Sequence, residues 1–180
     1  MSARLAAFAT ALLVLLLAAP AAEAGKKKPK RLDGNAVISF KGVGQIKLGM
    51  SLKQARKAAR RTISDGRIVT PGCRHDQVFP RRFGLSTLRF NGKIRVLYVT
   101  RTAMPTRRGV RVNDSLARLQ SKYGASLIER PSDVSPQTRI FELHGEGGRE
   151  IQFSVNSVTN RIFQIATGLA PEVDFSEGCA

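Results

Sequence analysis

The sequence has no tryptophan, 2 tyrosines, 2 cysteines and 2 histidines, and only 13 acidic residues against 30 lysines and arginines. Two cysteines and two histidines are too few for an all-protein zinc framework or a disulfide-dense mini-protein. The shortage of Trp and Tyr leaves few of the aromatic anchors that tight protein interfaces use. A net charge of +17 and a hydrophobic content of 42% describe a basic chain that can bury a core. Its 180 residues fit one domain or two small repeats that share a sheet.

Residues 1–24 have the pattern of a secretory signal peptide. Arg4 provides a basic start, Leu5–Ala19 is apolar, and the final Ala-Glu-Ala has the small-x-small form of a cleavage site. We therefore expect cleavage after Ala24, a secreted or extracytoplasmic protein, and no membrane span in the mature chain. The alternative is an uncleaved anchor. The basic residues that follow favour it, but the apolar stretch is shorter than the roughly 20 residues that span a bilayer.

The two cysteines are Cys73 and Cys179. An even number of cysteines in an oxidising compartment predicts a disulfide, which ties the C-terminus to the middle of the chain. A thiolate beside the imidazole of His75 is the other reading of Cys73. No motif orients a third group there, so the sequence does not favour nucleophilic catalysis.

The first half of the mature chain predicts one helix among strands and loops. Ser51 and Gln54 form a capping box, so a helix should begin at Leu52 and run to about Arg61. The other expected elements are a basic flexible linker at 25–34, a strand at 36–40 and a loop at 67–83.

A hairpin is expected around Asn91-Gly92. A two-residue turn would place Phe90 opposite Lys93 and mix apolar with basic side chains on one face. A longer turn or a bulge would pair Phe90 with Ile94 and Leu88 with Val96, so we expect one of these. The second strand is apolar on both faces and should lie centrally in its sheet.

The second half repeats the sequence pattern that precedes the first helix. Val110–Leu116 has the same order of apolar, basic, apolar and Ser-Leu positions as Ile46–Leu52. A helix is expected over 115–123, ending at Gly124, with Leu116, Leu119, Gln120 and Tyr123 inward. Three strands should then form a meander, at 138–143, 150–155 and 161–169. The expected fold class is α+β, with short helices packed on an antiparallel β-sheet. A degenerate tandem repeat is expected, with copies at 35–105 and 106–180.

The helix entry Leu48-Gly49-Met50-Ser51-Leu52, with a weaker copy at 112–116, resembles a motif of one exported superfamily. That superfamily holds the tandem-repeat β-lactamase inhibitory proteins and the small lipoproteins of bacterial outer-membrane assembly. The resemblance implies helices on an antiparallel sheet whose exposed face binds another protein. The chain departs from the pattern because it lacks a convincing second helix after the first one and the lipoprotein cysteine. We therefore do not infer β-lactamase inhibition for this chain from the resemblance.

Few residues suggest catalysis or metal binding. Glu142 and Glu150 could face each other across a hairpin, but solvated carboxylates on strands are the simpler interpretation. His144 reads as a polar loop residue, and the glycines that follow it make a turn rather than a phosphate cradle. We expect no metal, no cofactor and no catalytic residue.

Basic residues at helical spacing are the strongest indication of function in the sequence. With two other arginine pairs they form a basic face that would attract anions: Lys53, Arg56, Lys57, Arg60, Arg61, Arg81, Arg82, Arg107 and Arg108. The expected partner is another protein or an anionic envelope polymer, and export argues against intracellular nucleic acid. The expected function is non-catalytic binding at or outside the envelope. The alternative is an exported hydrolase of envelope or glycan substrates, and a surface without function is also compatible with the composition.

Overall fold

The computed structural model describes residues 30–132 and 135–174. The predicted signal peptide, the first half of the predicted linker (25–29) and Cys179 lie outside these ranges.

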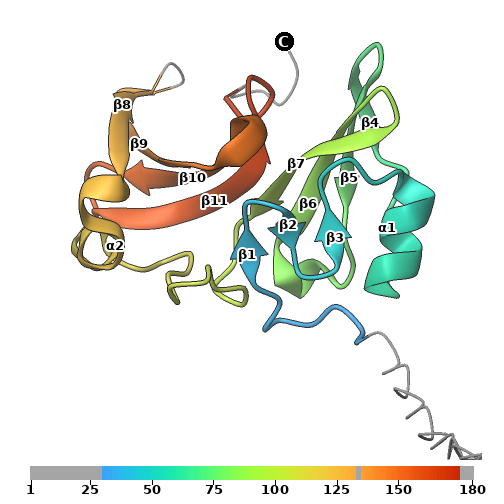
Figure 1. Ribbon diagram of the computed structural model, residues 1–180, viewed down its shortest axis with the longest axis horizontal. Coiled ribbons are helices and arrows are strands. Elements are labelled where there is room, and N and C mark those ends of the chain that lie inside the picture. Colours follow the sequence, from blue (N-terminus) through green and yellow to red (C-terminus); the bar gives the residue numbers. More distant parts are fainter. Residues whose placement is uncertain (1–29, 133–134, 175–180) are drawn as a thin grey trace, which may run out of the picture.

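One antiparallel sheet organises the described chain (Figure 1). It has 8 strands in the order β4-β5-β6-β7-β11-β10-β9-β8, so two meanders meet along β7 and β11. Its strands are β4 (Arg67–Thr70), β5 (Cys73–Gln77), β6 (Leu85–Phe90), β7 (Lys93–Val99), β8 (Ile128–Pro131), β9 (Thr138–His144), β10 (Arg149–Asn156) and β11 (Arg161–Leu169).

Shorter elements complete the described fold. A small 3-stranded sheet is built from β1 (Ile38–Ser39), β2 (Gly42–Val43) and β3 (Ile46–Lys47). The α-helices are α1 (Leu52–Ala59) and α2 (Leu116–Tyr123), and the 3₁₀ turns are η1 (Arg81–Phe83), η2 (Gly124–Ser126) and η3 (Glu146–Gly148). Figure 1 shows α1 and α2 at opposite ends of the molecule. The α+β class with an antiparallel sheet is confirmed.

Helix α1 begins where its capping residues predict. The Ser51 side chain accepts a hydrogen bond from the Gln54 amide, and the Gln54 side chain accepts one from the Ser51 amide. These bonds satisfy amides that have no partner within the helix. The helix ends at Ala59, because Arg60 adopts a left-handed conformation.

The main core lies on one face of the sheet. Both helices and the small sheet pack there, and the buried side chains include Leu52 of α1, Leu119 of α2, Ile38 of β1 and Phe153 of β10. Burial of this apolar surface is the main favourable term in folding. We call this side the covered face of the sheet.

The opposite side, which we call the open face, carries a second cluster. Cys73, Leu88, Val96, Ala166 and Val173 form its apolar centre. Val173 follows β11, so the chain turns back onto this face after the last strand.

The two halves enter their helices in the same way. The amide of Gly49 donates to the Ile94 carbonyl and the Ile94 amide donates to Met50; Asn113, Ile162 and Asp114 repeat this pattern. Gly49 and Asn113 both have positive φ, of 81° and 74°.

The residues that cap the two helices also occupy matching places. Ser51 bridges the first residue of β7, Lys93, and Ser115 bridges the first residue of β11, Arg161. Each half therefore places its helix start against the final strand of its own meander.

The prediction of a loop at 67–83 is wrong, because this range contains β4 and β5. In β5 the fully buried inward residue is Asp76 rather than an apolar side chain. The usual alternation of apolar and polar residues is therefore hidden.

The hairpin uses a bulge. Phe90 pairs with Lys93 across a two-residue turn, and a register shift after Leu88 restores the expected Leu88–Val96 pair. The predicted pairing of Phe90 with Ile94 is wrong. Strand β7 lies centrally between β6 and β11, as expected.

Two smaller expectations also fail, and one strand was not predicted. Leu32, placed in the flexible linker, is fully buried, and its amide donates to the Ala59 carbonyl at the end of α1. Gln120 of α2 is exposed, not inward. Strand β8, at the edge of the sheet, was not expected.

Candidate functional site

The basic residues of α1 and η1 lie together in the structure. The guanidinium of Arg61 lies 5.2 Å from the centre of the Phe83 ring, and that of Arg82 lies 5.6 Å from the same ring. A cation over an aromatic ring is attracted to its face. The ring therefore joins the end of α1 to η1 and gathers the positive charges of both elements.

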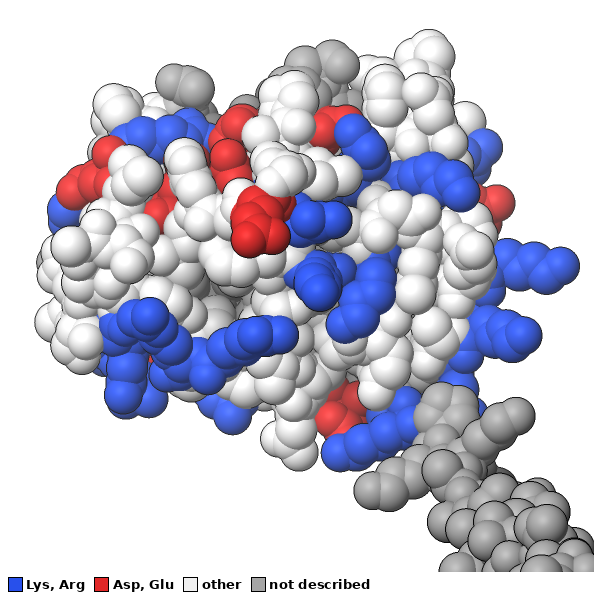
Figure 2. Space-filling model, viewed as in Figure 1, with Lys and Arg blue, Asp and Glu red and all other residues white. Residues whose placement is uncertain are grey.

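We define the α1–η1 basic surface as Lys53, Arg56, Lys57, Arg60, Arg61, Arg81 and Arg82. All but Arg61, which is half-buried, are exposed. Among the described residues, no carboxylate forms an ion pair with Lys53, Lys57, Arg81 or Arg82. Figure 2 shows basic side chains projecting along the border of the molecule where α1 lies in Figure 1.

The positive charges on this surface act on one another. Partial burial lowers the pKa of Arg61, and the neighbouring charges of Arg31 and Arg82 lower it further, although the carboxylate of Asp33 opposes this shift. Like charges this close disfavour the charged form of each group. An anion at this surface would relieve their repulsion.

Arg107 and Arg108 belong to a different region. Both line a pocket of about 270 Å³ whose other walls include Ile38, Leu143 and Tyr123. The Arg108 guanidinium stacks over the Tyr123 ring at 5.1 Å. The expected basic face is thus divided between α1–η1 and this pocket.

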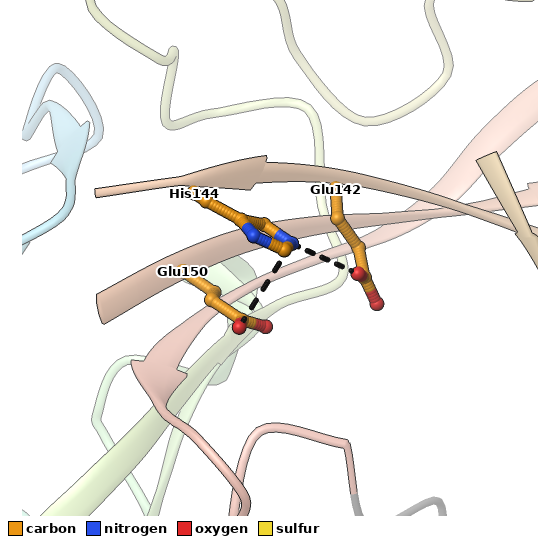
Figure 3. Close-up of side chains that lie close together, drawn as sticks. All are labelled: Glu142, His144 and Glu150. Carbon is orange, nitrogen blue, oxygen red and sulfur yellow. Dashed lines mark hydrogen bonds and ion pairs between the residues drawn. The ribbon is translucent and has the colours of Figure 1, made fainter. Parts of the chain in front are cut away.

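Three polar side chains converge on the open face at one end of β9 and β10 (Figure 3). The Nε2 atom of His144 lies 3.3 Å from Oε2 of Glu142 and 4.0 Å from Oε1 of Glu150. Glu142 and His144 are two residues apart on β9, so they share a face, and Glu150 pairs directly with His144 across the ladder.

The carboxylate of Glu142 is held firmly from one side. Its Oε1 accepts hydrogen bonds from Arg130 Nε and, at 3.2 Å, from Gln152. Burial alone would raise the pKa of Glu142, but the bonds from Arg130, His144 and Gln152 outweigh it and hold the pKa below its usual value. Glu142 is 5% exposed, so the interpretation of a solvated carboxylate is wrong.

Glu150 has a different environment. Its side chain is 12% exposed, and its buried Oε2 atom has no hydrogen-bond partner in the described part of the chain. Burial raises its pKa, and the negative charges of Asp174 and Glu142 raise it further. The ladder thus places two carboxylates with opposite pKa shifts beside one imidazole.

The sequence did not identify this cluster as a site. His144 is an exposed residue at the end of β9 rather than part of a loop. The sequence did contain a signal for it. Glu142 and His144 are two residues apart before a short turn and Glu150 follows that turn, a spacing that places all three side chains on one face of a hairpin.

Three polar or reactive residues of β5, Asp76, His75 and Cys73, lie outside this cluster. Asp76 is fully buried and accepts two hydrogen bonds from Arg89, so it is not available to a substrate. His75 contacts Ser86, with 3.0 Å between Nε2 and Oγ. Cys73 is buried, and its expected partner Cys179 lies outside the described residues, so their disulfide stays a prediction.

No protein-family model and no curated protein sequence matches this chain. Among solved structures, the uncharacterized protein yfeY from Escherichia coli is similar, with a TM-score of 0.53 at 19% sequence identity. The match covers 73% of this chain and 99% of that one. It supports the fold and carries no information about activity.

An extracellular protein from Bacillus anthracis that contains an SCP domain is similar at a TM-score of 0.46 and 10% identity. The match covers 81% of this chain and 49% of that one, and a likeness this low carries no argument. No catalytic function is evidenced by these comparisons. Within residues 30–132 and 135–174, no helix is both long and apolar enough to cross a membrane.

Proposed function

We propose that this chain is an exported, non-catalytic binding protein that associates with an anionic polymer of the cell envelope through the α1–η1 basic surface. The observation that carries the proposal is the shared contact of Arg61 and Arg82 with Phe83, which concentrates positive charge on this surface. Lys53 and Lys57 of the same surface are exposed, and no carboxylate among the described residues pairs with them. Polyanions bind such surfaces by charge complementarity and by release of counterions.

The polymer is favoured over a protein partner by the composition of the surface. Long, exposed cations contribute mainly long-range attraction, whereas tight protein interfaces depend on buried aromatic anchors. The sequence has no Trp and 2 Tyr, and burial raises the pKa of both tyrosines, Tyr98 and Tyr123. Neither ring is therefore well placed to anchor a partner.

We also infer that the two halves are a degenerate duplication of one helix-plus-meander unit. The support is the repeated bonding pattern in which Gly49 corresponds to Asn113 and Ile94 to Ile162. The α1–η1 surface belongs to the first unit. Helix α2 of the second unit carries fewer basic residues, Arg118 and Lys122, and Arg118 is paired with Asp114 at 3.0 Å.

The test uses the mature chain, beginning at Gly25, and the envelope fraction of its own cells. A Lys53→Ser/Arg82→Ser variant removes two charges from the surface. An Arg107→Ser/Lys122→Ser variant removes the same charge elsewhere and is the matched control. We expect wild type and control to bind at low salt and release at high salt, because salt screens exposed charges, and the surface variant to bind much less.

Two results would overturn the proposal. Equal loss of binding in both variants would mean that net charge alone governs association. Retention of a discrete protein after the high-salt wash would instead favour a packed protein interface.

The competing proposal is an exported hydrolase, and one observation favours it. Glu142 and Glu150 have pKa values shifted in opposite directions, an arrangement that general acid–base catalysis uses. Turnover of an envelope glycan that disappears in a Glu150→Gln variant with unchanged folding would establish this reading.

A further inference from the structure

The cluster of Glu142, His144 and Glu150 lies on the open face of the second meander and takes no part in the proposed polymer binding. Its three ligand atoms, one from each residue, lie within 4.8 Å of one another. Because the three side chains come from paired positions of β9 and β10, the sheet itself fixes their spacing. Sites built on strands hold their geometry better than sites on loops.

We propose that Glu142, His144 and Glu150 bind a divalent first-row transition-metal ion such as Zn²⁺. The donor set is two carboxylates and one imidazole. Imidazole nitrogen suits Zn²⁺ and its neighbours, whereas Mg²⁺ and Ca²⁺ prefer all-oxygen sites. Three protein ligands leave a coordination position for water or for a group from a partner.

The distances fit such an ion. Zn²⁺ binds His nitrogen and Glu oxygen at about 2.0–2.2 Å, so two ligands at a tetrahedral angle lie about 3.4 Å apart. His144 Nε2 and Glu142 Oε2 are already 3.3 Å apart. His144 Nε2 and Glu150 Oε1 are 4.0 Å apart, which a small side-chain rotation would close.

The surroundings of the cluster also fit a cation. Arg130 and Gln152 bind Oε1 of Glu142 and leave Oε2 facing the imidazole, as outer partners of metal-ligating carboxylates do. The buried Oε2 atom of Glu150 has no hydrogen-bond partner within residues 30–132 and 135–174. A buried carboxylate oxygen without a partner is costly, and a cation bound by the Glu150 carboxylate would offset the cost of burying its charge.

The experiment uses the mature, untagged chain, freed of metal by a chelator. Zn²⁺ binding is measured by calorimetry at neutral pH, with Mg²⁺ and Ca²⁺ as comparison ions, and Co²⁺ serves as a visible spectroscopic reporter of ligand number. We expect one Zn²⁺ per chain. His144→Gln and Glu150→Gln should each weaken binding by at least about tenfold, the lower limit for changes to outer-shell partners.

His75→Gln is the matched control, because it removes the other histidine, which also lies on the sheet, and should leave Zn²⁺ affinity unchanged. Glu150→Gln should fold at least as stably as wild type without metal, since it removes a largely buried negative charge that lies near the charges of Asp174 and Glu142. Absence of Zn²⁺ binding, or equal binding by wild type and His144→Gln, would overturn the proposal. Polymer binding by wild type in those cases would leave the proposed function standing.

Discussion

Asp76 and Arg89 form a two-pronged ion pair inside the first meander. Arg89 Nε lies 2.5 Å from Oδ2 of Asp76, and its Nη2 lies 2.9 Å from Oδ1. Thr87 and the amide of Gly66 donate the remaining hydrogen bonds to the carboxylate. Asp76 is fully buried, so this pair forms part of the core between β5 and β6.

Removing one partner of this pair should be strongly destabilising. Asp76→Asn leaves the Arg89 charge without its buried partner, and such changes cost about 3–5 kcal/mol. Asp65→Asn is the control: Asp65 also bonds Arg89, at 2.6 Å, but its side chain is 61% exposed. Exposed pairs contribute at most about 1 kcal/mol. Urea unfolding of both variants measures the difference, and similar losses would contradict the buried-pair interpretation.

The same pair explains what sequence reasoning could and could not predict. The start of α1 depends on the side chains of Ser51 and Gln54, which are close in sequence, and was predicted correctly. Strands β9–β11 show apolar alternation and were also found. Strand β5 was missed because Asp76, its inward residue, is stabilised by Arg89 of the next strand. A local pattern carries no information about a partner from another strand.

The candidate metal cluster was missed for a related reason. Glu142 reads as a solvated carboxylate, and its burial becomes visible only when Arg130 of β8 and Gln152 of β10 are placed beside it. Strand β8 is an edge strand with largely exposed side chains, so its sequence lacks the alternation that would have identified it.

The equivalence of Gly49 and Asn113 predicts a specific pattern of tolerance. Gly49 is exposed with a φ of 81°, and a Cβ there would meet no other atom within 4 Å. Gly49→Ala should therefore report backbone strain alone, a loss of roughly 1–2 kcal/mol. Gly49→Asn should cost less, because Asn adopts this conformation at residue 113 with a φ of 74°. Chemical denaturation of both variants is the measurement, and equal losses would contradict the equivalence.

The predicted disulfide between Cys73 and Cys179 is supported by the path of the chain after β11. Val173, which precedes Cys179 by six residues, packs in the same open-face cluster as Cys73. Alkylation followed by mass spectrometry should label both cysteines only after reduction. Reduction should lower the free energy of unfolding by up to about 4.7 kcal/mol, the chain-entropy value for a loop of about 100 residues. Labelling of unreduced, folded protein would refute the bridge.

Tyr98 supplies a test of the open face by pH. Burial raises the pKa of its phenol to about 12. Burial also raises the pKa of Tyr123, so neither tyrosine should ionise near the ordinary value of about 10 while the protein is folded. Because the pKa of Tyr98 is higher in the folded state, its stabilising contribution is complete below pH of about 10 and is lost as the pH rises toward 12.

Tyrosinate absorbance follows this ionisation directly, since the sequence contains no Trp and only 2 Tyr. We expect the absorbance to appear above a pH of about 10, with the Tyr98 part delayed toward 12, and to coincide with loss of near-ultraviolet circular dichroism. Tyr98→Phe should roughly halve the signal and flatten the alkaline fall in stability. A full tyrosine titration at the ordinary pKa in folded protein would show that the centre of the open face is solvated, contrary to the packing of Tyr98 against the Leu88–Val96 cluster.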